Sequence, residues 1–216
     1  MSDTAEAKPS EWNGFVVDDF RFDTFAPGAR VLDVGCGHGE QLRALRQAGF
    51  DAVGVEPSSE LVAALNAEGL DVRRGFAERL PVESASFDGL VCKVVLPYTD
   101  ERRAIGEWAR VLCPGARVLA SYHGAGYYAR YLREGPGLAF RIYAARSLAN
   151  TWWYAATGRR LPGFIGDTLY QSSARLGRYY REYGFALERV WPSRRYGRWP
   201  VFIYHELRYA GTPART

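Results

Sequence analysis

The stretch VLDVGCGHGE, residues 31–40, places a glycine at every second position directly behind a short apolar strand. Ordering a glycine costs more backbone entropy than ordering any other residue, so three glycines at this spacing need a structural reason. Arg30–Val34 has the pattern of a strand, and the segment after the glycines places Leu42, Leu45 and Ala48 at helical spacing. The stretch therefore predicts a strand, a tight turn and a helix, with a ligand site at the carboxyl end of the strand.

Short apolar segments alternate with helical patterns over the first half of the chain. Strands are expected at residues 30–34, 51–56, 71–75, 87–95 and 116–123, and helices at 40–50, 58–70 and 100–112. This alternation predicts a parallel sheet with helices on both faces, and a ligand at the carboxyl ends of its strands. The alternation stops after residue 123. A helix at 168–184 and two consecutive strands, 185–191 and 201–208, then predict an antiparallel edge.

The composition is that of a globular domain, with 47% apolar residues, 24% charged residues and a net charge of +4. No apolar run has the length of a membrane span, and the polar opening, residues 1–13, is predicted to be a flexible tail rather than a secretion signal. Residues 14–212 are expected to form a single domain. The cysteines have no metal-ligand spacing, which favours a reducing, cytoplasmic compartment. They are Cys36, Cys92 and Cys113.

Residues 124–170 are rich in aromatic side chains with interleaved arginines, and we expect them to form a helical cap inserted after the fifth strand. Aromatic walls with arginines suit a small molecule such as a glycan or another specialised metabolite. Three interpretations stay open: a cap over a small-molecule substrate, a peripheral helix on an anionic membrane, and a homodimer surface. No nucleic-acid-binding module is visible beyond the basic patch, so nucleic acid is not favoured as a partner.

A glycine turn of this kind serves two classes of cofactor. Dinucleotide sites use G-x-G-x-x-G, but here Gly39 falls one place early, and Glu40 follows it where a carboxylate would repel a pyrophosphate. S-adenosylmethionine carries instead a sulfonium cation, an ammonium group and a ribose. Asp33 could bind the ammonium group, and Glu56, at the end of the second strand, could accept hydrogen bonds from both ribose hydroxyls. These residues favour S-adenosylmethionine.

Four segments in order resemble the motifs of class I S-adenosylmethionine-dependent methyltransferases, namely VLDVGCGHGE, VGVEPS, FAERLPVESASFDGLVC and EWARVLCPGARVLAS. The resemblance covers residues 30–122, slightly under half of the chain. It implies a Rossmann-like, doubly wound α/β fold with a seven-stranded sheet, mostly parallel, whose last strand is antiparallel. It also implies that the chain is an enzyme with S-adenosylmethionine as its cofactor.

The resemblance further implies the cofactor contacts. The methionyl side is expected at Asp33, Gly35, Cys36 and Gly37, with Gly39 completing the glycine cradle. Glu56 is expected to hold the ribose, Pro57 to lie beside the adenine, Phe76 and Ala77 to flank the base, and Lys93 to pass close to the methionyl group.

Two of these residues depart from the family pattern. The family usually has Asp or Asn where this chain has Phe76. Phe76 could stack on the adenine, or point away and leave the bond to the adenine amino group to Glu78 or to the backbone. Lys93 places a cation beside a sulfonium, and it could pair instead with Asp33, with Asp88 or with the methionine carboxylate.

Methyl transfer is an in-line displacement, for which the enzyme aligns the reactants and, for some oxygen or nitrogen acceptors, supplies a base. His123, at the end of the fifth strand, is the favoured base, with a packing role as its alternative. Tyr98 is a second candidate, or a pocket wall, while Asp100 is expected to cap a helix. His38 and His205 are expected to be structural.

The sequence thus predicts methylation of a small-molecule acceptor on oxygen or nitrogen. The alternatives are a lipid or quinone-type acceptor at a membrane surface, and a non-catalytic protein that binds S-adenosylmethionine. A dinucleotide oxidoreductase is a more distant one.

Overall fold

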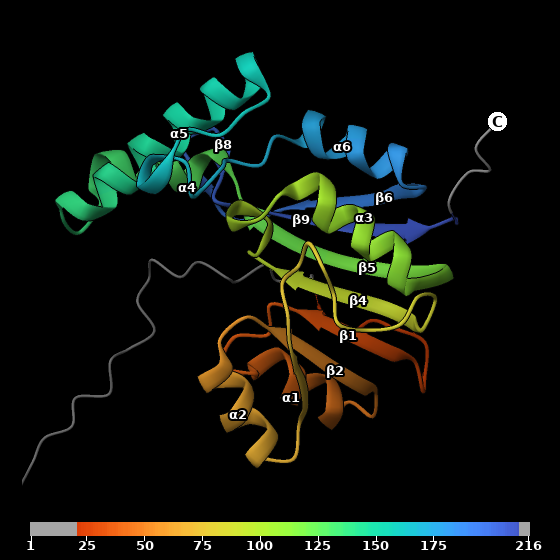
Figure 1. The fold of residues 1–216 in the computed structure, drawn as a ribbon. Helices are drawn as coiled ribbons and strands as arrows, with labels where there is room; N and C mark the ends of the chain where they lie inside the picture. Colours follow the sequence, from red (N-terminus) through yellow and green to blue (C-terminus); the bar gives the residue numbers. More distant parts are fainter. Residues whose placement is uncertain (1–20, 212–216) are drawn as a thin grey trace, which may run out of the picture.

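The computed structural model describes residues 21–211, so the predicted tail at residues 1–13 lies outside the described residues. Figure 1 shows the elements in space. The first half contains β1 Arg30–Val34, α1 Glu40–Gln47, β2 Asp51–Glu56, α2 Ser59–Ala67, β3 Asp71–Arg74, β4 Phe87–Lys93, η1 Leu96–Tyr98, α3 Glu101–Val111 and β5 Leu112–His123. The second half contains α4 Ala125–Glu134, α5 Leu138–Thr157, η2 Gly163–Ile165, α6 Ser173–Glu182, β6 Phe185–Pro192, β7 Arg195–Tyr196, β8 Trp199–Pro200 and β9 Phe202–Tyr209.

The elements form one seven-stranded sheet of order β3-β2-β1-β4-β5-β9-β6 and a small β7–β8 hairpin. β1 pairs in parallel with β2 and β4, and β4 with β5, as predicted. β9 is antiparallel to both of its neighbours, β5 and β6. The predicted fold class is therefore confirmed. The two final strands form the predicted antiparallel edge, with β9 next to β5 and β6 along its outer side.

Three predicted boundaries are wrong by a few residues. β4 ends at Lys93 rather than at residue 95, because Val94 has a φ of 58° and leaves the extended conformation. β5 begins at Leu112 rather than at 116, with a register irregularity against β4 that accommodates the Cys-Pro-Gly stretch. α6 begins only at Ser173, because the preceding segment is held extended by the hydrogen bond from Leu169 N to Pro97 O, 2.9 Å.

The helix caps agree with the sequence. The Ser58 side chain accepts from Leu61 N at the start of α2, and Asp100 accepts from Arg103 N at the start of α3. Each face of the sheet has its own apolar cluster. On one face, Trp108 of α3 and Leu176 of α6 are completely buried against the sheet, and on the other face α1 and α2 pack over the β1–β3 side (Figure 1).

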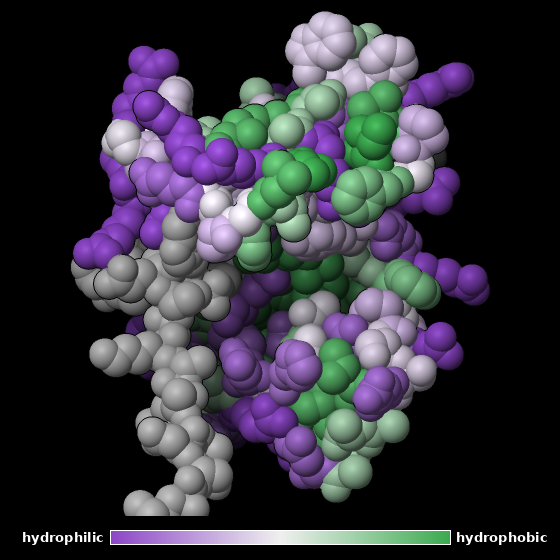
Figure 2. Space-filling model, turned by 90° about the vertical axis from the view of Figure 1, so that its left-hand side faces the viewer, coloured by the Kyte–Doolittle hydropathy of each residue, from purple (hydrophilic) through white to green (hydrophobic). Residues whose placement is uncertain are grey.

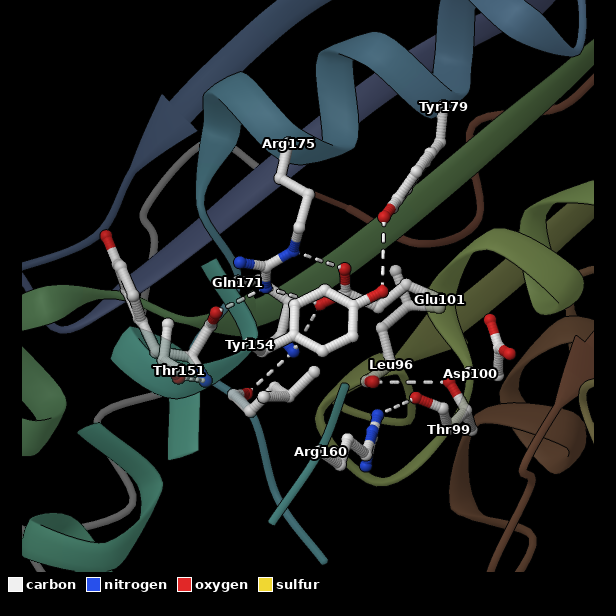
Figure 3. Close-up of polar contacts among 12 residues, drawn as sticks. Leu96, Thr99, Asp100, Glu101, Thr151, Tyr154, Arg160, Gln171, Arg175 and Tyr179 are labelled. Atoms are coloured by element: carbon white, nitrogen blue, oxygen red, sulfur yellow. Dashed lines mark hydrogen bonds and ion pairs between the residues drawn. The ribbon is translucent and has the colours of Figure 1, made fainter. Parts of the chain in front are cut away.

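A buried ion pair joins α3 to α6 (Figure 3). The Arg175 guanidinium donates two hydrogen bonds, of 2.7 and 2.8 Å, to the Glu101 carboxylate, and both side chains are buried. Gln171 Nε2 adds a third donor to the same carboxylate at 3.0 Å. Because all three groups are withdrawn from water, the Glu101 carboxylate depends on Arg175 and Gln171 for its hydrogen bonds.

Replacing Glu101 should therefore destabilise the fold strongly. We expect Glu101→Ala to lower the free energy of unfolding by about 3 kcal/mol, because Arg175 would stay buried without its partner. Glu68→Ala, which removes the exposed ion pair with Arg43, should cost less than about 1 kcal/mol. Urea denaturation of both variants measures the difference, and equal losses would contradict a specific role of burial.

Candidate functional site

The predicted helical insertion is present, since α4 and α5 follow β5 directly. They lie beyond the carboxyl ends of the parallel strands, on the left of Figure 1. Seen from that side, in Figure 2, the molecule is hollowed between an upper lobe and the lower lobe that carries α1 and α2. The site predicted from the glycine turn therefore faces a recess.

A cavity of about 390 Å³ opens at the carboxyl end of β1. Its lining has the acids Asp33 and Glu40 and the cation Lys93, together with Gly35, Cys36, His38, Gln41 and Val94. Four of the predicted cofactor contacts, Asp33, Gly35, Cys36 and Lys93, thus line one cavity. Gly37 and Glu56 are not among the lining residues, but a hydrogen bond from Gly37 N to Glu56 Oε2, 3.1 Å, ties the same glycine turn to the end of β2.

The backbone N–H groups of the glycine turn are already used inside the protein. Gly35 N and Cys36 N both donate to Val55 O, at 2.8 and 3.1 Å, and Gly39 N donates to Cys36 O at 2.8 Å. Gly37 N donates to Glu56. A phosphate site needs free N–H groups aimed at the ligand. This turn instead presents carboxylates beside satisfied amides, an arrangement that suits a cationic ligand better than a pyrophosphate.

The glycines themselves are required mainly by the protein's own packing. All three have positive φ, between 53° and 78°. A Cβ at Gly35 would collide with the side chain of Val95, and a Cβ at Gly39 would lie 2.7 Å from Leu65 Cδ2. Only at Gly37 would a Cβ meet nothing within 4 Å. Gly37 is therefore the one glycine of the turn with open space beside it.

Glu56 ends β2 as a buried carboxylate held by the backbone. Its Oε2 accepts from Gly37 N and its Oε1 accepts from Ser58 N, each at 3.1 Å. A carboxylate has about four acceptor positions, so two stay available for the ribose hydroxyls that were predicted here. The hydrogen bonds fix the carboxylate before any ligand arrives.

Asp33 is a buried carboxyl group with a raised pKa. It is only 2% exposed, and its Oδ2 has no hydrogen-bond partner among the described residues. Burial raises the pKa of Asp33 to about 7, against a smaller opposing effect of the Lys93 charge. Of the three partners proposed for Lys93, Asp88 is excluded, because it binds Arg30 N at the opposite end of β4. An ammonium group at this cavity would satisfy the free Asp33 oxygen.

The predicted adenine contacts have different environments. Ala77 is buried, Pro57 is exposed, and Phe76 is 61% exposed at the carboxyl side of β3. Glu78 is engaged elsewhere, because its Oε1 accepts from Asp100 N at 2.8 Å. These contacts stay predictions, with the Phe76 ring free to meet a ligand.

His123 lies in an aromatic cluster at the end of β5. Its ring stacks on Tyr127 with centroids 3.6 Å apart, and the Phe202 centroid lies at 5.4 Å. The side chain is 5% exposed, its Nδ1 has no partner in the described chain, and burial lowers its pKa to about 3. A general base at neutral pH needs a much higher proton affinity. The base role stays a prediction, and these features favour the packing alternative.

Tyr98, the other catalytic candidate, lies in η1 and is 54% exposed. Its hydroxyl lies 3.4 Å from the hydroxyl of Tyr143 on α5, so it contacts the cap. Tyr143 in turn stacks near Tyr128 of α4, with centroids 6.3 Å apart. Burial raises the pKa of Tyr143 and Tyr128, which keeps both phenols protonated.

Sequence reasoning missed two residues of this region. Val94 lines the cavity with a φ of 58°, a strained conformation for a β-branched residue, and no sequence signal marks it. Tyr143 was noted only as one aromatic of the cap, although it is the one that touches Tyr98. His38 is an exposed residue that lines the cavity. His205 is buried beside Tyr180, as a structural role requires.

Within residues 21–211, no group of three metal-ligating side chains lies together, and Cys36, Cys92 and Cys113 are unpaired. None of the helices in this described part is long and apolar enough to cross a membrane.

The strand order and the acid-lined cavity at the end of β1 agree with the class I S-adenosylmethionine-dependent methyltransferase fold that the sequence predicts. Residues 32–120 match the family model of the methyltransferase domain. The predicted family, fold and cofactor class are confirmed for this domain.

Related sequences agree over the same half of the chain. An uncharacterized methyltransferase from Mycobacterium tuberculosis is 37% identical over 95 residues, covering 43% of this chain and 39% of that protein. A ubiquinone biosynthesis O-methyltransferase from Hahella chejuensis is 35% identical over 103 residues, covering 44% and 43%. The chain thus covers about two fifths of the length of these curated relatives.

Solved structures support the fold over a greater length. An S-adenosylmethionine-dependent methyltransferase from Mesorhizobium loti superposes with a TM-score of 0.62 at 22% identity, covering 84% of this chain and 91% of that one. A second, from Methanosarcina mazei, has a TM-score of 0.64 at 17% identity, covering 86% and 94%. At these identities the likeness shows the fold.

The raised pKa of Asp33 predicts pH-dependent binding of S-adenosylmethionine. A cationic ligand prefers the ionised carboxylate, whereas below pH 7 the free protein holds the proton there. The affinity should therefore fall, by up to about tenfold for each pH unit, as the pH drops from 7 to 5. Over that range the ligand's own amino group stays protonated, because α-amino groups titrate near pH 8.

Calorimetry across this pH range measures the slope, and Asp33→Asn is the control because its amide cannot titrate. We expect the variant to bind weakly and with little pH dependence. An equal slope in both proteins would show that another group is responsible.

Proposed function

We propose that this protein is an S-adenosylmethionine-dependent methyltransferase that acts on a small-molecule acceptor, on oxygen or nitrogen. The observation that carries the proposal is the pairing of the free Asp33 oxygen with the backbone-held Glu56 carboxylate at one glycine turn. When bound, S-adenosylmethionine supplies a methyl group activated by its sulfonium charge.

The chain's own residues would divide the binding between them. Asp33 would hold the ammonium group, Glu56 the ribose hydroxyls, and the open space beside Gly37 would admit the ligand against backbone. Lys93, at the end of β4, would bind the carboxylate of the methionyl group. Its charge lowers the pKa of Asp33 by less than burial raises it, so Lys93 is not fully neutralised by Asp33. This arrangement offers no cluster of free N–H groups for a pyrophosphate, which disfavours a dinucleotide.

The acceptor would bind between the cofactor and the cap. Tyr98 and Tyr143 provide hydroxyl groups on either side of the junction between η1 and α5. Aromatic walls with hydroxyl groups suit planar or sugar-like acceptors. The lipid or quinone alternative draws support from the ubiquinone O-methyltransferases among the relatives, although their similarity covers about half of the chain or less. We also propose a cytoplasmic location, in a reducing compartment. A homodimer is a further proposal for the oligomeric state.

Calorimetry on Glu56→Ala tests the cofactor site. The loss of charge-assisted hydrogen bonds to the ribose should weaken S-adenosylmethionine binding at least tenfold. Glu60→Ala makes the same charge change at an exposed position of α2 and should bind like the parent protein. NADH should bind to none of the three proteins. Tight NADH binding by the parent, without an S-adenosylmethionine signal, would overturn the proposal.

The variant His123→Phe separates the two roles of His123. If the ring serves packing, an aromatic replacement preserves the stack on Tyr127, and methyl transfer should stay within about threefold of the parent. If it is the base, transfer should fall by about a hundredfold or more. The assay follows labelled methyl from S-adenosylmethionine into a small-molecule cell extract. We expect the first outcome, because of the low pKa of His123. No transfer by the parent protein would favour the non-catalytic alternative.

A further inference from the structure

The cap helix α5 is inverted relative to an ordinary surface helix. Its buried face carries polar side chains beside Ala144, since Ser147 and Asn150 are completely buried and Thr151 is half-buried. Its outward face carries Leu138, 73% exposed, and Trp152, 72% exposed. A surface helix of a globular protein normally places these two classes of side chain the other way round.

The polar face is fully explained by its contacts within the chain. Asn150 Nδ2 donates to Thr168 O at 2.8 Å, and its Oδ1 accepts from Leu161 N at 2.9 Å. The Ser147 hydroxyl lies 2.7 Å from the Thr168 hydroxyl, and Thr151 Oγ1 accepts from Tyr170 N at 2.8 Å. The returning segment 161–170 is thus hydrogen-bonded to these polar groups. If the helix rotated to bury its apolar side, these hydrogen bonds would be lost.

The apolar face has no partner among residues 21–211. Its members recur every three or four residues along the helix, so they share one side of it. The exposed members are Leu138, Ile142, Ala145, Leu148, Ala149 and Trp152. A helix of 20 residues is about 30 Å long. The stripe is therefore long enough to be a docking surface rather than a few scattered side chains.

The positive charge around this apolar stripe favours an anionic partner. α5 has no acidic residue, and the whole segment 124–170 has only two acids, Glu134 and Asp167, against six arginines. Both acids are engaged, Glu134 by the Tyr196 hydroxyl at 2.7 Å and Asp167 by Arg146. Arg141 lies exposed on the apolar side of the helix. The six arginines are Arg130, Arg133, Arg141, Arg146, Arg159 and Arg160.

We propose that the outward face of α5 docks on an anionic membrane surface, with the helix lying in the plane of the interface. Leucine and tryptophan side chains would enter the boundary between head groups and acyl chains, and the exposed arginines Arg133, Arg141 and Arg159 would meet lipid phosphates. A second copy of the chain is a poorer partner. Two-fold pairing through this face would place Arg141 of one copy near the positively charged cap of the other.

Docking by itself does not depend on the proposed methyl transfer. Its consequence for the acceptor does rest on that function: α5 carries Tyr143 beside Tyr98, so a docked cap would place the recess next to molecules held in the membrane. The acceptor class would then be one with an apolar tail, such as a lipid or a quinone.

Flotation with vesicles tests the docking. We expect the full chain to float with vesicles of phosphatidylcholine and phosphatidylglycerol and not with phosphatidylcholine alone, and to be released by salt. The double change Leu148→Gln and Trp152→Gln should reduce the partition coefficient about tenfold or more. Arg141→Glu should reduce it by about tenfold as well, since it reverses one charge at the surface.

Matched controls change the same chemistry elsewhere. Val190→Gln alters an exposed apolar residue of β6, 51% exposed, and Arg178→Glu reverses an exposed arginine of α6. Both should float like the parent. All altered side chains are exposed, so S-adenosylmethionine binding, measured on every variant, should be unchanged and reports the fold.

Failure of the parent to float with anionic vesicles overturns the proposal, as does equal flotation of the α5 variants. A dimer in sedimentation that the Leu148→Gln, Trp152→Gln change dissociates would identify a second copy as the partner and would also overturn it. If Asp33→Asn loses S-adenosylmethionine binding but floats normally, membrane docking through α5 is independent of the cofactor site. Failed binding by the parent with intact flotation would affect the proposed function alone.

Discussion

The hydrogen bond from Gly37 N to the Glu56 carboxylate joins the first strand–turn–helix unit to the second strand, and the site depends on it. Together with the donation of Gly35 N and Cys36 N to Val55 O, it closes the turn onto β2. The same bonds consume the N–H groups that would otherwise attract an anion. A single local geometry thus both builds the cavity and sets its preference for a cation with hydroxyl groups.

Two acidic residues, Glu101 and Asp33, are equally buried but differ in their hydrogen-bond partners. Glu101 receives three donors from Arg175 and Gln171, and its charge is fully compensated inside the protein. Asp33 is equally buried but has an oxygen without a partner, and its pKa is raised to about 7. A carboxylate left in this condition is a cost to the fold that a cationic ligand would relieve. Burial alone would not have distinguished the two.

The first half of the fold could be predicted because each signal was local: strand patterns, glycine turns, and the caps at Ser58 and Asp100. The errors came from distant partners. Nothing in the sequence around Leu169 shows that this segment is held extended by Pro97, so the predicted start of α6 is too early. The site stays a prediction; the structure brings four of its predicted residues, Asp33, Gly35, Cys36 and Lys93, to one cavity. The burial that lowers the pKa of His123 comes from neighbouring Tyr127 together with Phe202, which is far along the chain.

The cap shows most clearly why periodicity can mislead. The apolar residues of α5 occur around most of the helix, so its sequence does not say which side faces inward. The choice is made by Ser147, Asn150 and Thr151, whose bonds to residues 161–170 fix the rotation of the helix. The returning segment then reaches the loop after β4 through Arg160, which donates to Thr99 O (Figure 3). The two sides of α5 therefore have different contacts. Its outward face is exposed, while the Tyr143 hydroxyl on its inner side lies 3.4 Å from the Tyr98 hydroxyl. If the acceptor binds beside Tyr98 as proposed, a partner bound to the outer face would act on it through α5, without any change in the cofactor turn.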